Sequence, residues 1–249
     1  VVLEFDNKAL THRPDLWGHR GMAREIAAIT GAKFVDKKPA LKIPAKGKSP
    51  DVKVENVELC PRYMAVIIRG VKVAPSPEWM KQRLLATDHS VISNIVDVSN
   101  YIMEEIGQPL HTFDLKKIKG GIVVRHAKKG EELTTLDGIK HKLDPEMLVI
   151  ADHEKALGVA GVMGGEDSGI SENTVDILIE SANFDAVSVR QSSIKLGIRT
   201  DSVQRFEKSL DPAQCEIALK RAVELILELC PGATVDGPLT AIANFDDSE

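Results

Sequence analysis

The sequence predicts an α+β protein in which sheets of mixed or antiparallel strands are layered with helices. Apolar stretches of strand length are joined by hairpins and loops more often than by helices, which disfavours a doubly wound parallel sheet. Hydrophobic residues make up 43% of the 249 positions and charged residues 28%, as in ordinary globular domains. No apolar stretch approaches the roughly 20 residues that span a bilayer, so we expect no membrane partner.

The charge and the cysteine content limit the kinds of protein that this chain can be. The 32 basic against 37 acidic residues give a net charge of −5, which excludes a polybasic protein that binds nucleic acid by charge alone. Cys60, Cys215 and Cys230 form no CxxC pair, which suits the reducing cytoplasm and predicts thiols in the core or on the surface. The N-terminus shows no signal pattern, which favours the cytoplasm, and the chain opens on Val1 without an initiator methionine, so we expect a piece of a longer polypeptide.

The first 31 residues predict a small helical unit. A short strand and a turn precede a helix from about Asp15, which carries Met22, Ile26 and Ile29 on one face and ends at Gly31. Residues 33–50 then contain six lysines and three prolines, a composition that resists helix formation and buries little. We interpret this stretch as a linker, and a solvated connector is favoured over a surface that contacts RNA.

The rest of the chain alternates strands and helices. Apolar runs predict strands at 63–68, 121–126, 147–152, 156–162 and 176–181, and a hairpin around Asp137-Gly138. Capping residues and glycine stops predict helices that open at Ser76-Pro77, run from 94 to 106, run from 185 to 197, and run from Asp211-Pro212 to Cys230. No internal repeat is visible.

Several segments carry groups that suit a binding site. The glycine-rich run 158–166 matches neither GxGxxG nor a Walker loop, and both a crowded bulged strand and a ligand-facing loop stay open. His111 follows Pro109 on a predicted loop, where imidazole can orient or deprotonate a water, although a structural role is more frequent for a single histidine. Glu180 ends an apolar strand, either buried with a hydrogen-bonding partner or facing solvent.

Other chemistries find no support in the residue spacing. The polar stretch 199–207 reads as a loop after a glycine-terminated helix. No nucleophile elbow, HExxH or Cys/His ligand pattern is present, so neither covalent catalysis nor a zinc site is indicated. The residues alone therefore predict an α+β domain with a pocket formed from these segments.

The same segments resemble a known family. The chain is similar, over nearly all its length, to the central part of bacterial phenylalanine–tRNA ligase beta chains. The stretches that carry the resemblance keep one order along the chain: His12-Arg13-Pro14-Asp15-Leu16, Ala23-Arg24-Glu25, 94–101, 107–114, 161–166, 180–184, Arg199-Thr200-Asp201, Arg205-Phe206-Glu207 and Asp211-Pro212.

The resemblance implies an architecture and an assembly. Residues 1–45 would be the end of a helical B1-like segment with its linker, and residues 46–249 a B3/B4 editing domain. Family members are (αβ)2 heterotetramers whose alpha chain activates phenylalanine with ATP and Mg²⁺. This part of the beta chain would then need no cofactor or metal of its own, and its RNA contact would be the 3′ end of tRNA(Phe).

The resemblance also implies a reaction, the hydrolysis of tRNA(Phe) wrongly charged with tyrosine. An apolar synthetic pocket rejects an added hydroxyl by only about a hundredfold, so a second site must test for that hydroxyl. The roles carried over by position are Glu180 as acceptor of the phenol proton, the backbone of Ala160 and Gly161 as a donor, His111 as the group that positions water or ribose hydroxyls, and Thr200 as a hydrogen-bonding wall. Pro109 and Gly164 would shape the pocket, Ser202 would form part of its wall, and Ser99 and Asn100 would lie near the terminal adenosine.

This sequence departs from the family at a few positions. Ser99 replaces a usual threonine, Ser202 an alanine, Ser209 a glycine, and residues 89–91 an Ile-Arg-Pro run. These changes bear on editing efficiency and amino-acid preference. Two alternatives to an editing module are a non-catalytic scaffold or tRNA-docking segment of the same subunit, and a free-standing trans-editing protein.

Overall fold

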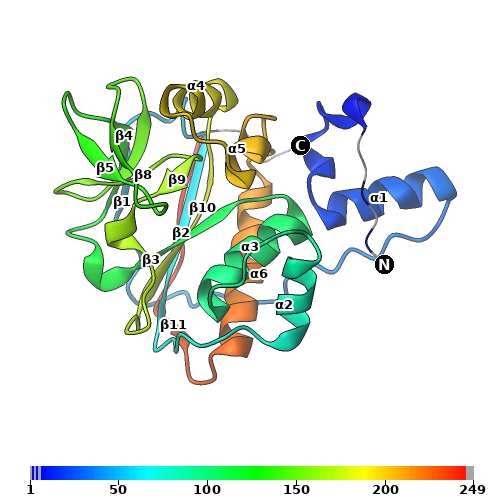
Figure 1. Cartoon of the computed structure of the whole chain (residues 1–249). Helices are drawn as coiled ribbons and strands as arrows, with labels where there is room; N and C mark the ends of the chain where they lie inside the picture. Colours follow the sequence, from blue (N-terminus) through cyan, green and yellow to red (C-terminus); the bar gives the residue numbers. More distant parts are fainter. Residues whose placement is uncertain (1, 3, 5–6, 245–249) are drawn as a thin grey trace.

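The computed structural model describes residues 2, 4 and 7–244, and it has three parts (Figure 1). An N-terminal helical segment stands at one side, a central sheet occupies the middle, and a second sheet lies on the side away from helix α6. The α+β class predicted from the sequence is therefore confirmed. No helix within these residues is long and apolar enough to cross a membrane.

The central sheet is antiparallel throughout. Its strands within the described residues are β2 (Arg62–Arg69), β3 (Leu110–Asp114), β10 (Ile177–Asn183), β11 (Thr234–Val235) and β12 (Thr240–Ala243). Strand β10 is buried along its whole length between β2 and β3. A strand covered on both faces carries apolar residues on both, which explains the nearly continuous apolar runs at 63–68 and 176–181.

The second sheet is mixed. It contains β1 (Val52–Val54), β4 (Ile122–His126), β7 (Leu148–Ala151), β8 (Ala156–Val159) and β9 (Met163–Gly164). Strands β1 and β4 pair in parallel and the other pairs are antiparallel. The predicted hairpin is confirmed as β5 (Glu132–Thr134) and β6 (Lys140–Lys142), and Gly138 takes the positive φ of 77° that its turn requires.

The second sheet covers one face of the central sheet, and helices cover the opposite face. They are α2 (Glu78–Leu85), α3 (Asn94–Ile106) and α6 (Gln214–Leu229), while α4 (Ala186–Leu196) and α5 (Asp201–Phe206) follow β10. Met64, Val66 and Ile68 of β2 pack into the core shared with α3 and α6, whereas Tyr63 and Ala65 pack into the core shared with the second sheet. The alternation of β2 thus builds one core on each side of the central sheet.

The side chains of β10 alternate between the two faces of the central sheet in the same way. Leu178 and Ala182 belong to the core on the second-sheet side, and Ile177 and Ile179 to the helix side. Because side chains two residues apart share a face, Glu180 lies between Leu178 and Ala182 and points toward the second sheet.

Some expected elements differ from those observed. His111 lies on strand β3 and not on a loop, because residues 110–114 pair with β10. The polar stretch 199–207 contains helix α5, which Thr200 caps through its side chain. Both predictions were wrong because β3 depends on a distant partner strand, and α5 is too short to display helical periodicity.

Helix starts differ by small amounts. Helix α1 (His19–Thr30) begins four residues later than predicted, after a 3₁₀ turn at Pro14–Leu16. Helix α2 begins at Glu78 with Pro77 as the capping residue, because the Ser76 hydroxyl donates instead to Asp97 Oδ2 (2.6 Å). Helix α6 begins after a turn in which Asp211 accepts from the Ala213 N–H (2.8 Å). The strand expected at the very start of the chain falls largely outside the described residues.

The lysine-rich stretch contains no helix or strand, as predicted, but it is attached to the domain. The N–H groups of Ala40 and Leu41 donate to Glu224 Oε1 on α6, at 2.7 and 3.1 Å. The three cysteines are all buried free thiols. The division of the chain at residue 45 stays a prediction.

Candidate functional site

A cavity of about 710 Å³ lies where the two sheets, α3 and α5 come together. All ten residues that the sequence analysis assigned to a site line this cavity: Ser99, Asn100, Pro109, His111, Ala160, Gly161, Gly164, Glu180, Thr200 and Ser202. They come from segments up to about a hundred residues apart in the chain. The fold therefore brings the predicted set together, and the roles of its members stay predictions.

Glu180 is a carboxyl group buried at the cavity wall. The residue is 6% exposed, and its Oε2 accepts a hydrogen bond from the Tyr63 hydroxyl at 2.6 Å. Burial raises the pKa of Glu180 to about 7, and the hydrogen bond from Tyr63 opposes that rise. Of the two sequence interpretations, the buried carboxyl with a hydrogen-bonding partner is the one observed.

His111 sits beside Glu180 on the adjacent strand. The two residues are direct cross-strand partners in the β3–β10 register. The imidazole packs edge-on against Phe113, with ring centroids 4.4 Å apart, and burial lowers the pKa of His111 to about 4. Its buried Nε2 has no hydrogen-bond partner within the described residues. At neutral pH the ring is therefore uncharged, with one nitrogen free for a water or a ligand hydroxyl.

The glycine-rich run also lines the cavity, with Gly164 against the His111 imidazole, so the ligand-facing interpretation fits its position. A Cβ at Gly164 would lie 2.4 Å from His111 Cε1, so the close approach of this backbone to the imidazole requires glycine. Gly161 takes a positive φ of 69°. The N–H of Ala160 donates to Leu148 O (3.0 Å), whereas that of Gly161 has no acceptor within residues 7–244. The expected backbone donor is thus available at Gly161 and not at Ala160.

Helix α5 holds this glycine loop in place. The Thr200 hydroxyl donates to Val162 O (3.0 Å) and accepts from the Val203 N–H (3.1 Å). The Ser202 hydroxyl donates to Gly161 O (3.1 Å). Both hydroxyls therefore bind the loop, and Ser202 adds a loop contact where an alanine could not.

The remaining predicted residues line the cavity from α3 and from the start of β3. Ser99 and Asn100 lie half-buried on α3, and neither side chain makes a hydrogen bond within the part of the chain described. Pro109 is buried just ahead of β3. The side chains of Ser99 and Asn100 are therefore polar groups that a ligand in the cavity can engage.

Sequence reasoning missed several contributors. The rings of Phe184 and Phe206 pack against each other at a tilt of 60° with centroids 5.1 Å apart, and both line the cavity, as does Phe113. Tyr63 binds Glu180 from inside an apolar strand, where only its hydroxyl distinguishes it from its neighbours. The long separation in sequence between these residues left no local signal.

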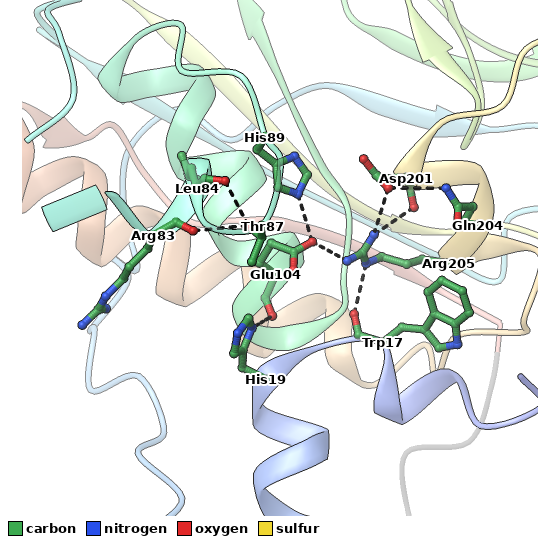
Figure 2. A network of polar contacts seen from close by, with 10 residues as sticks. All are labelled: Trp17, His19, Arg83, Leu84, Thr87, His89, Glu104, Asp201, Gln204 and Arg205. Carbon is green, nitrogen blue, oxygen red and sulfur yellow. Dashed lines mark hydrogen bonds and ion pairs between the residues drawn. The ribbon is translucent and has the colours of Figure 1, made fainter. Parts of the chain in front are cut away.

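A polar network borders the cavity at His89 (Figure 2). His89 Nε2 and Glu104 Oε1 are 3.0 Å apart, and this contact raises the pKa of His89. Arg205 Nη2 donates to the same Glu104 oxygen, and Arg205 Nε donates to Trp17 O (3.1 Å). Residue 89, where the sequence departs from the family it resembles, is therefore part of a network that joins α3, α5 and the N-terminal segment.

The site combines an apolar cavity with a few polar groups. Aromatic side chains, a buried carboxyl, an uncharged imidazole on the adjacent strand and a peptide N–H without an acceptor among the described residues all line it. Such a cavity suits an aromatic ligand that carries a hydroxyl, with water held beside it. Within residues 7–244 no group of three or more His, Cys, Asp or Glu side chains is arranged to hold a metal ion.

Comparison with known proteins assigns a family. Residues 59–231 match the B3/4 domain. The chain is 46% identical over 238 residues to the phenylalanine–tRNA ligase beta subunit of Solibacter usitatus, covering 95% of this chain and 31% of that protein. It is 47% identical over 231 residues to the same subunit of Aquifex aeolicus, covering 93% of this chain and 29% of that protein.

A solved structure also matches. It is an N-terminal fragment of the phenylalanyl-tRNA synthetase beta subunit from Pyrococcus horikoshii, with 18% identity and a TM-score of 0.43, covering 82% of this chain and 60% of that one. The chain spans about a third of the length of the curated relatives it matches.

Proposed function

The chain belongs to the B3/4 domain family, in the form found in phenylalanine–tRNA ligase beta subunits, and we propose that its cavity hydrolyses tRNA(Phe) mischarged with tyrosine. The observation that carries this proposal is Glu180, a buried carboxyl in the wall of a cavity lined by aromatic side chains. Tyrosine differs from phenylalanine by one hydroxyl. A buried hydrogen-bond acceptor therefore binds tyrosine more tightly than phenylalanine.

Selectivity follows from desolvation. A tyrosyl ester would place its phenol against Glu180, with the Gly161 N–H as a further donor. A phenylalanyl ester would leave these groups unpaired, which costs about 1 to 3 kcal/mol for each neutral group and more for a charged one. The site is therefore expected to favour the wrong product of the ligase over the correct one.

The reaction itself is the addition of water to an ester. Water attacks the acyl carbon, the bond to the ribose oxygen breaks, and that oxygen takes up a proton to leave as a hydroxyl. His111 is uncharged at neutral pH, so its free Nε2 can orient the attacking water or a ribose hydroxyl. The Thr200 and Ser202 hydroxyls hold the glycine loop, and we assign neither as a nucleophile.

The assembly around this module is also part of the proposal. We infer that the chain acts within a cytoplasmic α/β ligase of (αβ)2 form, in which the alpha subunit carries ATP and Mg²⁺. Contact with RNA is confined to the 3′ end of tRNA(Phe), which is compatible with the net charge of −5. Residues 46–249 form the editing domain, and residues 1–45 belong to a preceding helical one.

The test is deacylation of purified Tyr-tRNA(Phe) and Phe-tRNA(Phe) by the complete ligase. We expect the wild type to hydrolyse the tyrosyl ester selectively. Replacing Glu180 with alanine should reduce that preference about 10- to 100-fold, the equivalent of 1.4 to 2.8 kcal/mol. Replacing His111 with alanine should slow hydrolysis of the tyrosyl ester without unfolding the protein.

Two exposed residues supply matched controls. Glu172→Ala and His126→Ala remove the same kinds of side chain from the surface, away from the cavity, and should leave both rates unchanged. If the wild type hydrolyses neither ester faster than buffer does, the non-catalytic scaffold becomes the better hypothesis.

A further inference from the structure

Tyr63 lies behind the wall of the cavity, on strand β2. Its side chain is fully buried, and its hydroxyl is the one hydrogen-bond partner of the Glu180 carboxyl within residues 7–244. In the β2–β10 register Tyr63 pairs with Ala182 and Glu180 pairs with Ala65. The two side chains are therefore diagonal neighbours on the same face of the central sheet, and both belong to its rigid middle.

This geometry leaves the two carboxyl oxygens in different situations. Oε2 is occupied by the Tyr63 hydroxyl at 2.6 Å, whereas Oε1 accepts no hydrogen bond from any described residue. A carboxylate held at one oxygen by a buried donor can no longer rotate freely, so the other oxygen has a fixed direction.

We propose that Tyr63 is a positioning residue, which holds Glu180 by one oxygen so that the other reads the hydroxyl of the mischarged amino acid. This inference rests on the proposed editing function. Tyr63 touches no substrate, and it acts only through Glu180.

The hydrogen bond from Tyr63 matters because the other groups beside Glu180 do not stabilise its negative charge. The groups that face it are Tyr63 from β2, His111 from β3 and Cys60, whose thiol interacts electrostatically with the Glu180 carboxylate. Burial lowers the pKa of His111 to about 4, so the imidazole carries no positive charge at neutral pH. Burial also raises the pKa of the Cys60 thiol, which keeps that group neutral.

Tyr63 therefore opposes the effect of burial on Glu180. Its own pKa is raised well above the ordinary value by burial and by the neighbouring carboxylate, so its hydroxyl remains a donor. Removing that donor should raise the pKa of Glu180 above about 7, and more of the carboxyl would be protonated at neutral pH. Further charged or titratable groups lining the cavity are Asp88, His89, Asp137 and Asp201.

The experiment measures hydrolysis of Tyr-tRNA(Phe) and Phe-tRNA(Phe) by the complete ligase between pH 5.5 and 8.5. For Tyr63→Phe we expect the preference for the tyrosyl ester to fall about tenfold at pH 7, the equivalent of 1.4 kcal/mol. We also expect the pH midpoint of the preference to move upward, and part of the loss to persist at pH 8.5, where the carboxylate is ionised but no longer held at Oε2. An unchanged preference and midpoint would overturn the proposal.

A matched control removes the other tyrosine hydroxyl of this chain. Tyr101 is also mostly buried, but its hydroxyl accepts from Arg83 (2.6 Å) on the helix side of the central sheet. Tyr101→Phe should therefore leave preference and midpoint as in the wild type. A similar change in both variants would mean that any lost buried hydroxyl has this effect, and it would also overturn the proposal.

A double variant separates positioning from general stability. If Tyr63 acts only through Glu180, then Tyr63→Phe combined with Glu180→Gln should discriminate no worse than Glu180→Gln alone. This variant also lacks the unpartnered buried carboxylate that could impair folding of Tyr63→Phe. Additive losses would overturn the role of Tyr63 and leave the editing function standing. Equal wild-type rates for the two esters would overturn both.

Discussion

At the scale of single residues, the site depends on burial acting on two neighbouring groups of opposite type. Burial raises the pKa of Glu180 to about 7 and lowers that of His111 to about 4. Both shifts favour the uncharged form, because an apolar cavity solvates charge poorly. The imidazole therefore enters the chemistry as a neutral group at physiological pH, and the carboxyl is the group that titrates there.

The pKa of His111 predicts how stability changes with pH. In the unfolded chain the imidazole takes up a proton near pH 6.5, whereas in the folded chain it does so only near pH 4. The unfolded state thus binds more protons between these values, so stability is retained above pH 6.5 and is lost as the pH falls toward 4. We expect His111→Gln to remove on the order of 1 to 3 kcal/mol of this pH dependence.

Urea unfolding at several pH values between 4 and 8 would measure this effect. His126, an exposed histidine on β4, provides the comparison, and His126→Gln should reproduce the wild-type pH dependence. A His111→Gln variant with an unchanged slope between pH 6.5 and 4 would contradict the depressed pKa of His111.

The ten predicted site residues all line one cavity, and the reason lies in the resemblance more than in the residue patterns. Pattern reasoning alone left His111, Glu180 and the glycine run with structural and functional interpretations. It could not find Tyr63, because a hydroxyl inside an apolar strand gains meaning only when register places it beside Glu180. That register depends on β10, more than a hundred residues away in the sequence.

At the scale of elements, local signals decided which predictions succeeded. Helix α3 was predicted with its observed bounds, because Ser93 caps it and Gly107 ends it with a positive φ of 90°. Helix α5 was missed, since six residues are too few to show a period. Yet α5 matters to the site, because Thr200 and Ser202 hold the glycine loop from its first turn.

Helix α5 is itself anchored by Arg205, whose side chain is 7% exposed (Figure 2). We expect Arg205→Met to destabilise the protein by about 3 kcal/mol, since it removes a buried ion pair and leaves the half-buried Glu104 with His89 as its remaining partner. Hydrogen exchange should accelerate in α5 and in residues 17–31, and hydrolysis of the tyrosyl ester should slow because the glycine loop loses its support.

Arg24→Met is the matched control for this prediction. Arg24 lies on α1 and pairs with Asp15, but the two side chains are 54% and 25% exposed and Asp15 keeps Arg13 as a partner, so the loss should be about 1 kcal/mol or less. If the two substitutions lowered the free energy of unfolding by the same amount, burial of Arg205 would add nothing to the stability that its ion pair provides.

At the scale of the whole molecule, the central sheet separates two cores, one shared with helices α3 and α6 and one shared with the second sheet (Figure 1). The layered α+β arrangement was predictable from the balance of hairpins and helices along the chain. The docking of the N-terminal segment was not, because its contacts join residues that are 85 and 188 positions apart in the sequence and leave no local signal. His19 Nδ1 contacts Glu104 O (2.8 Å), and Arg205 binds Trp17 O.

These contacts predict how the chain responds to a protease. The lysine-rich stretch 33–50 is irregular and mostly exposed, so trypsin should cut there before it cuts within the sheets. We expect the two pieces to remain together on size-exclusion chromatography under native conditions, because α1 packs on α3 and Arg205 holds Trp17. In the Arg205→Met variant the smaller piece should separate more readily. Separation of the pieces in the wild type would contradict this expectation. It would show that residues 1–45 do not bind stably to the rest of the chain, and that the proposed division at residue 45 also separates two independent folding units.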